Sequence, residues 1–537
     1  MPLGEEDIRY HIDRNEKLKS IKAPYQPSWG DIARFIVPTR VQASEGSKKT
    51  FELYDATAIH SNKILAASMH GTLTPSSMLW STFKLRDDRL NTLREVMDWL
   101  EICEERMWLA RHQSNYNGAI HELYIDYPAF GQGCLLIEER HIGKPGFNGF
   151  LYKCFPNYQY CTARNSEGIV DTIYREFELS ARAAADRWKG GVGEKIQQSL
   201  EKDPDRKFEF VHCVLPNENG KGRPWVSYYI SKDDKKLVSE GGYYEFPYIV
   251  PAWYIVSGEE YGSGIGSDAL PDIKTLNKAK EYDLKGWAKD IDPATFETDQ
   301  GVLGTLDLTP GGRNVARDKN SIWTLDRKAR YDVTQIKMED LRQSIRQMFF
   351  SDQLKLQEGP EMTATEVHVR YELMQRLLGP SIGRYETEGL NPQIKREFNM
   401  MMRASSGRFP TLPPPPPVLA GMSAEELDIV YEGPLARAQR MGEASAIRRF
   451  FTVGVELSQV KQDVLDVADI DEGYRTIGEI EGVPSRVMRS EEEIRAIREK
   501  RAEAQRAEME KQNLERLAAG IKDITPAAKA LMEGGKA

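Results

Sequence analysis

One segment, residues 271–291, carries two stripes of side chains at the period of an α-helix, and these stripes limit how the chain can fold. At 100° per residue its apolar side chains fall within one arc of about 80°, and most of its lysines within a roughly opposite arc of about 60°. The apolar arc consists of Ile273, Leu276, Leu284, Trp287 and Ile291. The basic arc consists of Lys274, Lys278, Lys285 and Lys289, and Lys280 is the exception that lies inside the apolar arc.

The residues after this helix predict a compact insertion followed by a second helix. Asp292-Pro293 ends the first helix, because proline lacks a backbone N–H and restricts the residue before it. A glycine-rich stretch follows to about Trp323, with a turn at residues 309–312. A second helix is predicted over residues 333–351, so the local pattern is helix, insertion, helix.

The chain before residue 261 is predicted to be helical at first and then rich in strands. Residues up to about 140 are mainly helical, with one long helix over 89–113. From Cys134 to Ile255, runs of aromatic and β-branched residues favour strands, with one helical patch at 181–200 and turns at 165–168 and 232–236. The predicted fold class is therefore α+β. The predicted strands are 134–138, 169–179, 208–215, 225–230 and 248–256.

The C-terminal part of the chain is predicted to be helical beyond a stiff spacer. Residues 413–417 are five consecutive prolines, which must be extended and serve either as a rigid linker or as a docking motif for another protein. Residues 432–480 predict a smaller helical region. Ser490 and Glu493 form a capping box, and residues 491–516 mix both charges densely, as in a solvated helix or a weak bundle.

Composition places the chain among ordinary folded proteins. It is 537 residues long, 40% hydrophobic and 29% charged, and no apolar run is long enough to span a membrane. The N-terminal residues lack the apolar stretch of a signal peptide, so secretion is not expected. The net charge of −9 disfavours a sequence-specific DNA binder, but it does not exclude a protein past which DNA must slide. Reduced and mostly buried thiols are expected at Cys103, Cys134, Cys154, Cys161 and Cys213.

The motifs of common catalytic and cofactor sites are absent from the sequence. No phosphate-binding loop, no nucleophile elbow and no metal-binding histidine spacing occurs, since His121-Glu122 lacks the second histidine of H-E-x-x-H. The glycines of Tyr261–Gly266 predict a tight strand-to-helix turn rather than a dinucleotide site. We therefore expect no catalytic residue, no metal and no cofactor, and predict that the protein is not an enzyme.

Residues 361–396 hold a further group of local signals. Thr363 and Glu366 have the spacing of a capping box, and Glu366 can pair with Arg370 one helical turn later. A helix is thus predicted to begin near Met362 and to be interrupted around Gly379-Pro380. Taken alone, these signals indicate one more helix start.

Taken whole, this run resembles the head-to-tail connector, or portal, proteins of short-tailed double-stranded DNA bacteriophages. Other segments resemble the same family in the same order, and together they cover roughly residues 29–440. They are W-G-D-I-A-R-F-I-V-P at 29–38, Y-D-A-T-A at 54–58, L-A-A-S-M-H-G-T-L-T-P at 65–75 leading to Trp80, E-Y-D-L-K-G-W-A-K-D-I-D-P at 281–293, and Y-E-G-P-L-A-R-A-Q-R at 431–440.

The resemblance implies the portal architecture, assembled as a ring around a central channel. It assigns the wing to residues 1–260, with a return helix and the proline-rich linker at 363–430. It assigns the two stem helices to 261–292 and 326–351, the clip to 293–325, the tunnel loop to 352–362, and the crown with a C-terminal helical barrel to 431–537.

The resemblance also implies roles for particular side chains, each with an alternative. The basic arc faces either DNA in the channel or solvent and a neighbouring subunit, through carboxylates such as those of Glu339 or Asp340. Leu354 either belongs to the tunnel loop or ends the preceding helix. The expected loop residues are Leu354, Lys355 and Leu356. The expected clip cations, facing DNA or acidic partners, are Arg313, Arg317 and Lys319. The residues expected to be structural are Thr363, Glu366, Arg370, Gly379 and Pro380.

The implied function is a conduit at one capsid vertex through which double-stranded DNA is packaged and ejected. The implied partners are a ring of about twelve copies, the terminase large subunit, tail adaptor and tail tube proteins, scaffold and major capsid protein, and internal core proteins. The implied location is the virion, after assembly in the host cytoplasm, without a membrane. The alternative is an intracellular helical scaffold or adaptor without a DNA channel, which fits the acidity but not the ordered family-like segments.

Overall fold

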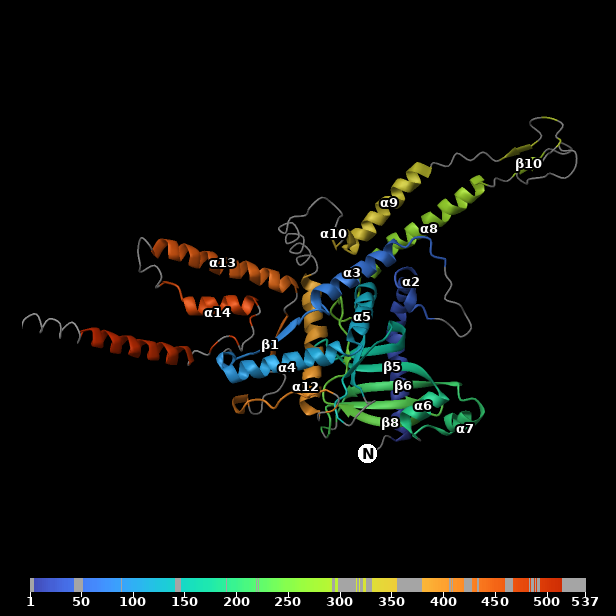
Figure 1. Ribbon diagram of the computed structural model, residues 1–537. Coiled ribbons are helices and arrows are strands. Elements are labelled where there is room, and N and C mark those ends of the chain that lie inside the picture. Colours follow the sequence, from blue (N-terminus) through green and yellow to red (C-terminus); the bar gives the residue numbers. More distant parts are fainter. Residues whose placement is uncertain are drawn as a thin grey trace, which may run out of the picture. The chain divides into compact units, whose positions relative to one another are not determined.

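A computed structural model divides the chain into two compact units (Figure 1). Unit 1 comprises Met1–Trp80 and Arg106–Leu412, and unit 2 comprises Ser81–Glu105 and Pro413–Ala537. The structure describes residues 4–42, 52–87, 89–140, 146–189, 191–218, 220, 222–291, 295–297, 315, 318, 322–324, 331–354, 379–404, 407, 409–419, 427–431, 434–458, 467–481, 483, 487, 489 and 493–513.

Unit 1 is built on an antiparallel sheet of five strands in the order β4-β5-β6-β7-β8. Neighbouring strands are joined in sequence, so each strand pairs with the next along the chain. The edge strand β8 was not predicted, because its residues 239–242 are Ser-Glu-Gly-Gly, which are poor strand formers. The strands are β4 (Tyr160–Arg164), β5 (Val170–Ser180), β6 (Lys207–Pro216), β7 (Trp225–Ser231) and β8 (Lys236–Tyr243).

Successive side chains along each strand point to opposite faces of this sheet, and both faces are buried by helices or by other strands. On β6, Val211 and Cys213 pack with Ile8 and Leu18 of α1 (Glu5–Lys22). Residues of the opposite parity, among them Phe208 and Phe210, pack against α6 (Ala181–Trp188) and α7 (Glu194–Lys202). A helical patch was predicted over 181–200, and the structure has two helices there. The patch is divided because Lys189 takes a left-handed conformation at φ 34° and ends α6.

A second sheet, in the order β3-β2-β9, packs on the far end of the α6–α7 face. Leu136 of β2 and Tyr248 of β9 share a buried cluster with Ile173 and Val214 of the larger sheet. The predicted strand 248–256 is wrong beyond its first residues, because β9 ends at Ile249 and two prolines flank it at 247 and 251. The strands are β2 (Leu135–Glu139), β3 (Phe150–Cys154) and β9 (Tyr248–Ile249).

The other helices of unit 1 surround these sheets or extend from them (Figure 1). At residues 386–390 one π-helical turn leads directly into α12, whose Arg396 donates hydrogen bonds to the carbonyl oxygens of Ile137 and Glu245. These helices are α2 (Gln26–Phe35), α3 (Thr57–Leu73), α5 (Tyr116–Phe130), α8 (Ile265–Ile291), α9 (Tyr331–Met348), α10 (Ser351–Leu354) and α12 (Asn391–Arg403).

Unit 2 joins an early segment of the chain to its C-terminal part. Strand β1 (Ser81–Leu85) pairs antiparallel with β12 (Leu427–Tyr431), so that Phe83 lies opposite Ile429. Residues 413–416 of the proline run belong to no helix or strand, and a short 3₁₀ turn begins at its last proline. Helix α4 (Arg94–His112) begins in unit 2 and ends in unit 1. The unit's other helices are α13 (Pro434–Ser458), α14 (Ile470–Glu481) and residues 493–513.

The α+β fold class is confirmed by these helices and antiparallel sheets. All five cysteines are free thiols, and four of them are buried, as the sequence predicted. Within the described residues, no helix combines the length and the apolar character that a bilayer span requires. The domain boundaries taken from the family resemblance stay predictions.

Candidate functional site: the paired helices α8 and α9

Helices α8 and α9 lie side by side and extend away from the sheets of unit 1 (Figure 1). Beyond their far ends, β10 (Thr295–Glu297) pairs antiparallel with β11 (Ile322–Thr324). The predicted order of helix, insertion and helix is confirmed. Helix α8 begins at Ile265, six residues before the predicted start at Pro271. Pro271 lies inside the helix, where a proline removes one backbone hydrogen bond but does not end the helix.

The start of α8 fits tightly against the end of α5. A Cβ added at Gly264 would lie 2.4 Å from the carbonyl oxygen of Pro128, and one at Gly266 would lie 2.2 Å from that of Ala129. Only glycine allows two backbones to approach so closely. The glycines of residues 262–266 therefore form the tight turn into a helix that the sequence predicted.

The base of the helical pair is held by buried apolar contacts and by polar contacts with the segment that precedes α3. Ser344 of α9 donates a hydrogen bond of 2.8 Å to Asp272 of α8. Arg342 pairs with Asp55 at 3.0 Å, and the Tyr54 amide donates to Asn277 at 2.8 Å. The buried apolar side chains of the pair include Ile273, Leu276, Met338 and Ile345, and Phe349 directly after α9 is also buried.

The carboxylate of Asp55 is held in its charged form. Burial alone would raise its pKa, but hydrogen bonds from Thr57 and Arg342 outweigh that effect and lower the pKa below its ordinary value. Arg342 also bonds Glu339, and Arg346 bonds the other oxygen of Glu339. Glu339 is therefore engaged by its own helix and does not serve the lysines of α8 within the chain.

The predicted basic arc exists, but two carboxylates compensate half of the charge of its four lysines. Lys274 pairs with Asp31 of α2. Lys278 and Lys285 lie 2.8 Å and 2.5 Å from the two oxygens of the same carboxylate, that of Glu281. Hydrogen bonds from these two lysines lower the pKa of Glu281. Only for Lys289 is no carboxylate found within ion-pair distance among the described residues.

The apolar arc of α8 divides into a buried and an exposed half. Ile273 and Leu276 are buried, whereas Leu284 is 38%, Trp287 61% and Ile291 65% exposed. An exposed row of large apolar side chains at helical spacing is typical of a surface that another chain covers.

Several predicted site residues lie outside the part of the chain that the structure describes. They are Arg313, Arg317, Lys319, Lys355, Leu356, Thr363, Glu366 and Arg370. Leu354 is the last residue of α10, the short helix that follows α9 after Phe350 turns the chain at φ 55°. Gly379 and Pro380 lie in a helical segment, residues 379–385. The residues before 379 lie outside the described part of the chain, so the interruption predicted at Gly379-Pro380 stays a prediction.

The sequence reasoning missed the carboxylates that organise this site. Glu281 lies three residues after Lys278 and four before Lys285, so helical spacing could have identified the cluster. Asp31 and Asp55 lie far away in sequence, within the W-G-D and Y-D-A-T-A segments quoted above. Only the folded chain brings them to α8 and α9.

The comparisons with known proteins match almost the whole chain. The family described as "Bacteriophage head to tail connecting protein" matches residues 11–488. The "Probable portal protein" of Bordetella phage BPP-1 is 26% identical over 533 residues, covering 92% of this chain and 91% of that protein. The "Portal protein" of Salmonella phage epsilon15 is 26% identical over 517 residues, covering 91% and 90%.

Proposed function

The chain belongs to the family of bacteriophage head-to-tail connecting proteins, and on this premise we propose that its copies close into a ring of about twelve subunits around a DNA channel. It is a phage portal protein, which is a structural protein and not an enzyme. In the proposed ring, the paired helices α8 and α9 form the stem of the channel.

The observation that carries this proposal is the uncovered half of the apolar arc on α8. A closed ring requires two different faces on each subunit, each fitting the next copy. The exposed row of Leu284, Trp287 and Ile291 supplies one such face on a helix that extends away from the sheets of unit 1. A second copy of the chain would cover these side chains and remove their apolar surface from water.

The basic arc is proposed to line the channel with a reduced charge. Its carboxylate partners come from α8 itself and from α2, so it does not need those of a neighbouring subunit. Because Glu281 is shared by Lys278 and Lys285, that cluster carries a net charge of one rather than two. A weakly basic lining attracts phosphates without holding the moving duplex.

The finer assignments follow the family. We assign the residues between α8 and α9, which include β10 and β11, to the face where the terminase large subunit and later the tail proteins dock. Scaffold and major capsid protein would surround the ring at one vertex of the virion. The residues after α10 would form the loop that narrows the channel.

The ring is tested by native mass spectrometry and negative-stain imaging of the purified full chain. We expect a closed ring of about a dozen subunits with a central hole. The double variant Trp287→Asp, Ile291→Asp should shift the population to monomers and small oligomers, because two charges cannot be buried at an apolar interface. The control Ile169→Asp changes a residue that is 59% exposed on a turn of unit 1, and it should leave the ring intact.

A wild-type chain that stays monomeric at high concentration would overturn the ring. If the double variant still forms rings, the exposed row of α8 is not part of the interface between subunits. Circular dichroism of each variant separates a loss of assembly from a loss of folding.

A further inference from the structure

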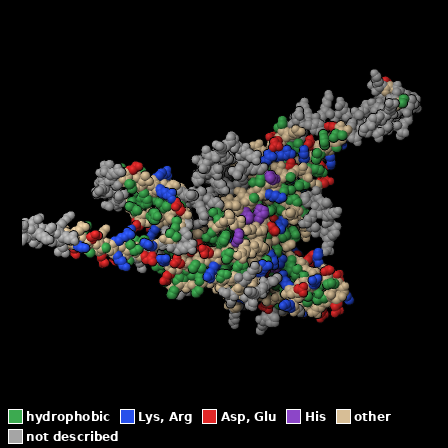
Figure 2. All heavy atoms as spheres, viewed as in Figure 1, with side chains coloured by type: hydrophobic (Ala, Val, Ile, Leu, Met, Phe, Trp, Pro, Cys, Tyr) green, Lys and Arg blue, Asp and Glu red, His purple; other side chains and the backbone are tan. Residues whose placement is uncertain are grey.

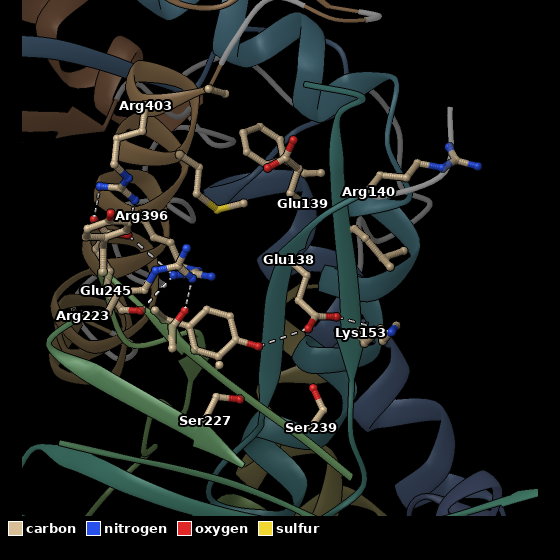
Figure 3. A pocket seen from close by; sticks show the side chains of 18 of the residues that line it. Glu138, Glu139, Arg140, Lys153, Arg223, Ser227, Ser239, Glu245, Arg396 and Arg403 are labelled. Carbon is tan, nitrogen blue, oxygen red and sulfur yellow. Dashed lines mark hydrogen bonds and ion pairs between the residues drawn. The ribbon is translucent and has the colours of Figure 1, made fainter. Parts of the chain in front are cut away.

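A groove of about 1040 Å³ opens in unit 1, far in sequence from the stem residues (Figure 3). It lies over the five-stranded sheet and is lined by the end of α6, by the three-stranded sheet and by α12. Its floor consists of cross-strand neighbours on β7 and β8, with Ser227 opposite Gly241 and Tyr229 opposite Ser239. Helix α12 supplies one wall, and β2 with β3 supplies another.

The groove is basic within an acidic chain. Six cationic and three anionic side chains line it, so its net charge is 6 − 3 = +3, against −9 for the whole chain. The cations are Arg140, Lys153, Arg187, Arg223, Arg396 and Arg403, and the anions are Glu138, Glu139 and Glu245.

Two of the carboxylates are already engaged at the walls. Glu245 receives two hydrogen bonds from Arg403, at 2.6 Å and 2.7 Å. Glu138 lies 3.6 Å from Lys153 and accepts a hydrogen bond from Tyr243. These pairs fix the walls, and Figure 3 shows them on either side of the opening.

Three guanidinium groups of the lining, those of Arg140, Arg187 and Arg223, have no carboxylate partner among the described residues, and hydrogen bonds orient the last two. Arg187 donates to the hydroxyl of Tyr229 at 3.0 Å and lies 4.8 Å from the centre of that ring. Arg223 donates to the carbonyl oxygen of Gly242 and lies 5.2 Å from the ring of Tyr244. Aromatic rings and carbonyl oxygens orient both groups but leave their charge uncompensated, so each is preset to receive an anion.

The floor is rigid and uncharged. The buried imidazole of His212 bonds Ser227 at 2.9 Å and Tyr248 at 2.6 Å, and it stacks on Tyr229 with ring centres 4.1 Å apart. Burial lowers the pKa of His212 well below its ordinary value, so the imidazole is neutral near pH 7. Above Gly241 no atom lies within 4 Å of the position of a Cβ, so the floor has room for an inserted side chain.

We propose that this groove binds an extended acidic peptide segment of a partner protein. Its carboxylates would meet Arg187 and Arg223, and one aromatic or aliphatic side chain would lie over Tyr229 and Gly241. This role goes beyond the DNA channel, because the groove belongs to the sheets of unit 1 and not to α8 and α9.

A peptide fits better than a nucleic acid for an electrostatic reason. Glu138, Glu139 and Glu245 line the opening together with the cations. A nucleic-acid strand carries one phosphate about every 3.4 Å and cannot avoid these carboxylates. A peptide can place its acidic residues at the guanidinium groups of Arg187 and Arg223 and neutral residues beside the glutamates.

The proposal is tested by fluorescence anisotropy with the full-length protein at low and high salt. The probe is a labelled peptide of about eight residues in which Asp and Glu alternate with Tyr and Leu, long enough to cross the groove when extended. The matched probes are the same peptide with Asn and Gln, and a single-stranded oligonucleotide of equal charge. We expect the acidic peptide alone to bind, with weaker binding at high salt.

Three variants locate the binding. Arg187→Gln with Arg223→Gln should weaken the acidic peptide by about a hundredfold, which is about tenfold for each lost charge-assisted contact. Gly241→Leu should also weaken peptide binding, because the added side chain would occupy the space above the floor of the groove. It removes no side-chain contact of the wild-type protein. The control Arg182→Gln with Lys236→Gln removes two exposed charges from α6 and β8 outside the groove lining, and should change the affinity less than twofold.

Each other result overturns the proposal. These results are equal binding of the neutral peptide, tighter binding of the oligonucleotide, no binding at low salt, or equal losses in the groove and control variants. Native mass spectra of the same samples report the ring independently, so failure of the groove and failure of the ring are distinguished.

Discussion

At the scale of single residues, a buried ion pair ties α4 to α12 inside unit 1. Arg111 is 3% and Glu397 0% exposed in side-chain terms, and their closest atoms lie 2.6 Å apart. Glu397 also accepts hydrogen bonds from Tyr152 at 2.7 Å and Gln393 at 2.9 Å. All charge is thus paired, as burial at this depth requires.

Glu397→Leu should destabilise the protein by about 3–5 kcal/mol, because it leaves the guanidinium of Arg111 buried without a partner. The double variant Arg111→Met, Glu397→Leu should recover much of this loss. The measurement is the midpoint of urea unfolding of the full chain. As a control, Glu178→Gln breaks an exposed pair with Lys207 and should cost at most about 1 kcal/mol. Equal midpoints for the two single variants would contradict the buried-pair argument.

At the scale of elements, the packing of α1 on the large sheet combines an apolar patch with a polar cluster. Ile8 and Leu18 join the buried cluster on that face. Glu176 of β5 accepts from Asn15 at 2.7 Å and pairs with Lys19 at 2.7 Å and Lys232 at 3.0 Å. Burial alone would raise the pKa of Glu176, but the hydrogen bonds and charges of the two lysines outweigh it and lower the pKa.

This lowered pKa predicts an acid-sensitive contact. A carboxylate with a depressed pKa in the folded protein stabilises it above the ordinary value of 4.5, and this contribution is lost as the pH falls below that value. The melting temperature of the wild type should therefore fall more steeply below about pH 4.5 than that of Glu176→Gln. Melting curves of both proteins from pH 7 to pH 3 check this, and parallel curves would contradict it.

Several elements were predictable because their signals are local. The helical period of α8 and the β-branched runs of β5, β6 and β7 record which side chains face a core. Strands β1 and β12 carried no comparable signal, because each pairs only with a segment that lies far away in the sequence. The missed end of α6 at Lys189 depends on one residue's backbone conformation, which periodicity does not report.

At the scale of the whole molecule, the charge of the assembly matters more than that of one chain. If about twelve copies close into a ring, the compensated lysines of α8 form repeated rings of weak positive charge. Each exposed ion pair contributes little to stability, so in the proposed ring its main effect would fall on the electrostatic field inside the channel.

Glu281→Gln should raise the affinity of the assembled ring for a double-stranded DNA fragment and steepen its dependence on salt. The variant frees Lys278 and Lys285, and each additional phosphate neutralised steepens the logarithmic salt slope by about 0.9. Binding titrations at several salt concentrations measure this slope. The control Glu194→Gln removes the same charge from the surface of α7, and equal slopes in the two variants would show that only net charge acts.

The sequence by itself determined the fold class, the helical pair with its insertion and the family, because these depend on local periodicity and on ordered segments along the chain. Only the tertiary structure decided which carboxylates compensate the basic arc, which half of the apolar arc stays exposed, and where the basic groove opens. Those features depend on distances between residues far apart in sequence. Asp31 reaches Lys274 and Asp55 reaches Arg342 only after the chain has folded, and no local pattern encodes such a contact.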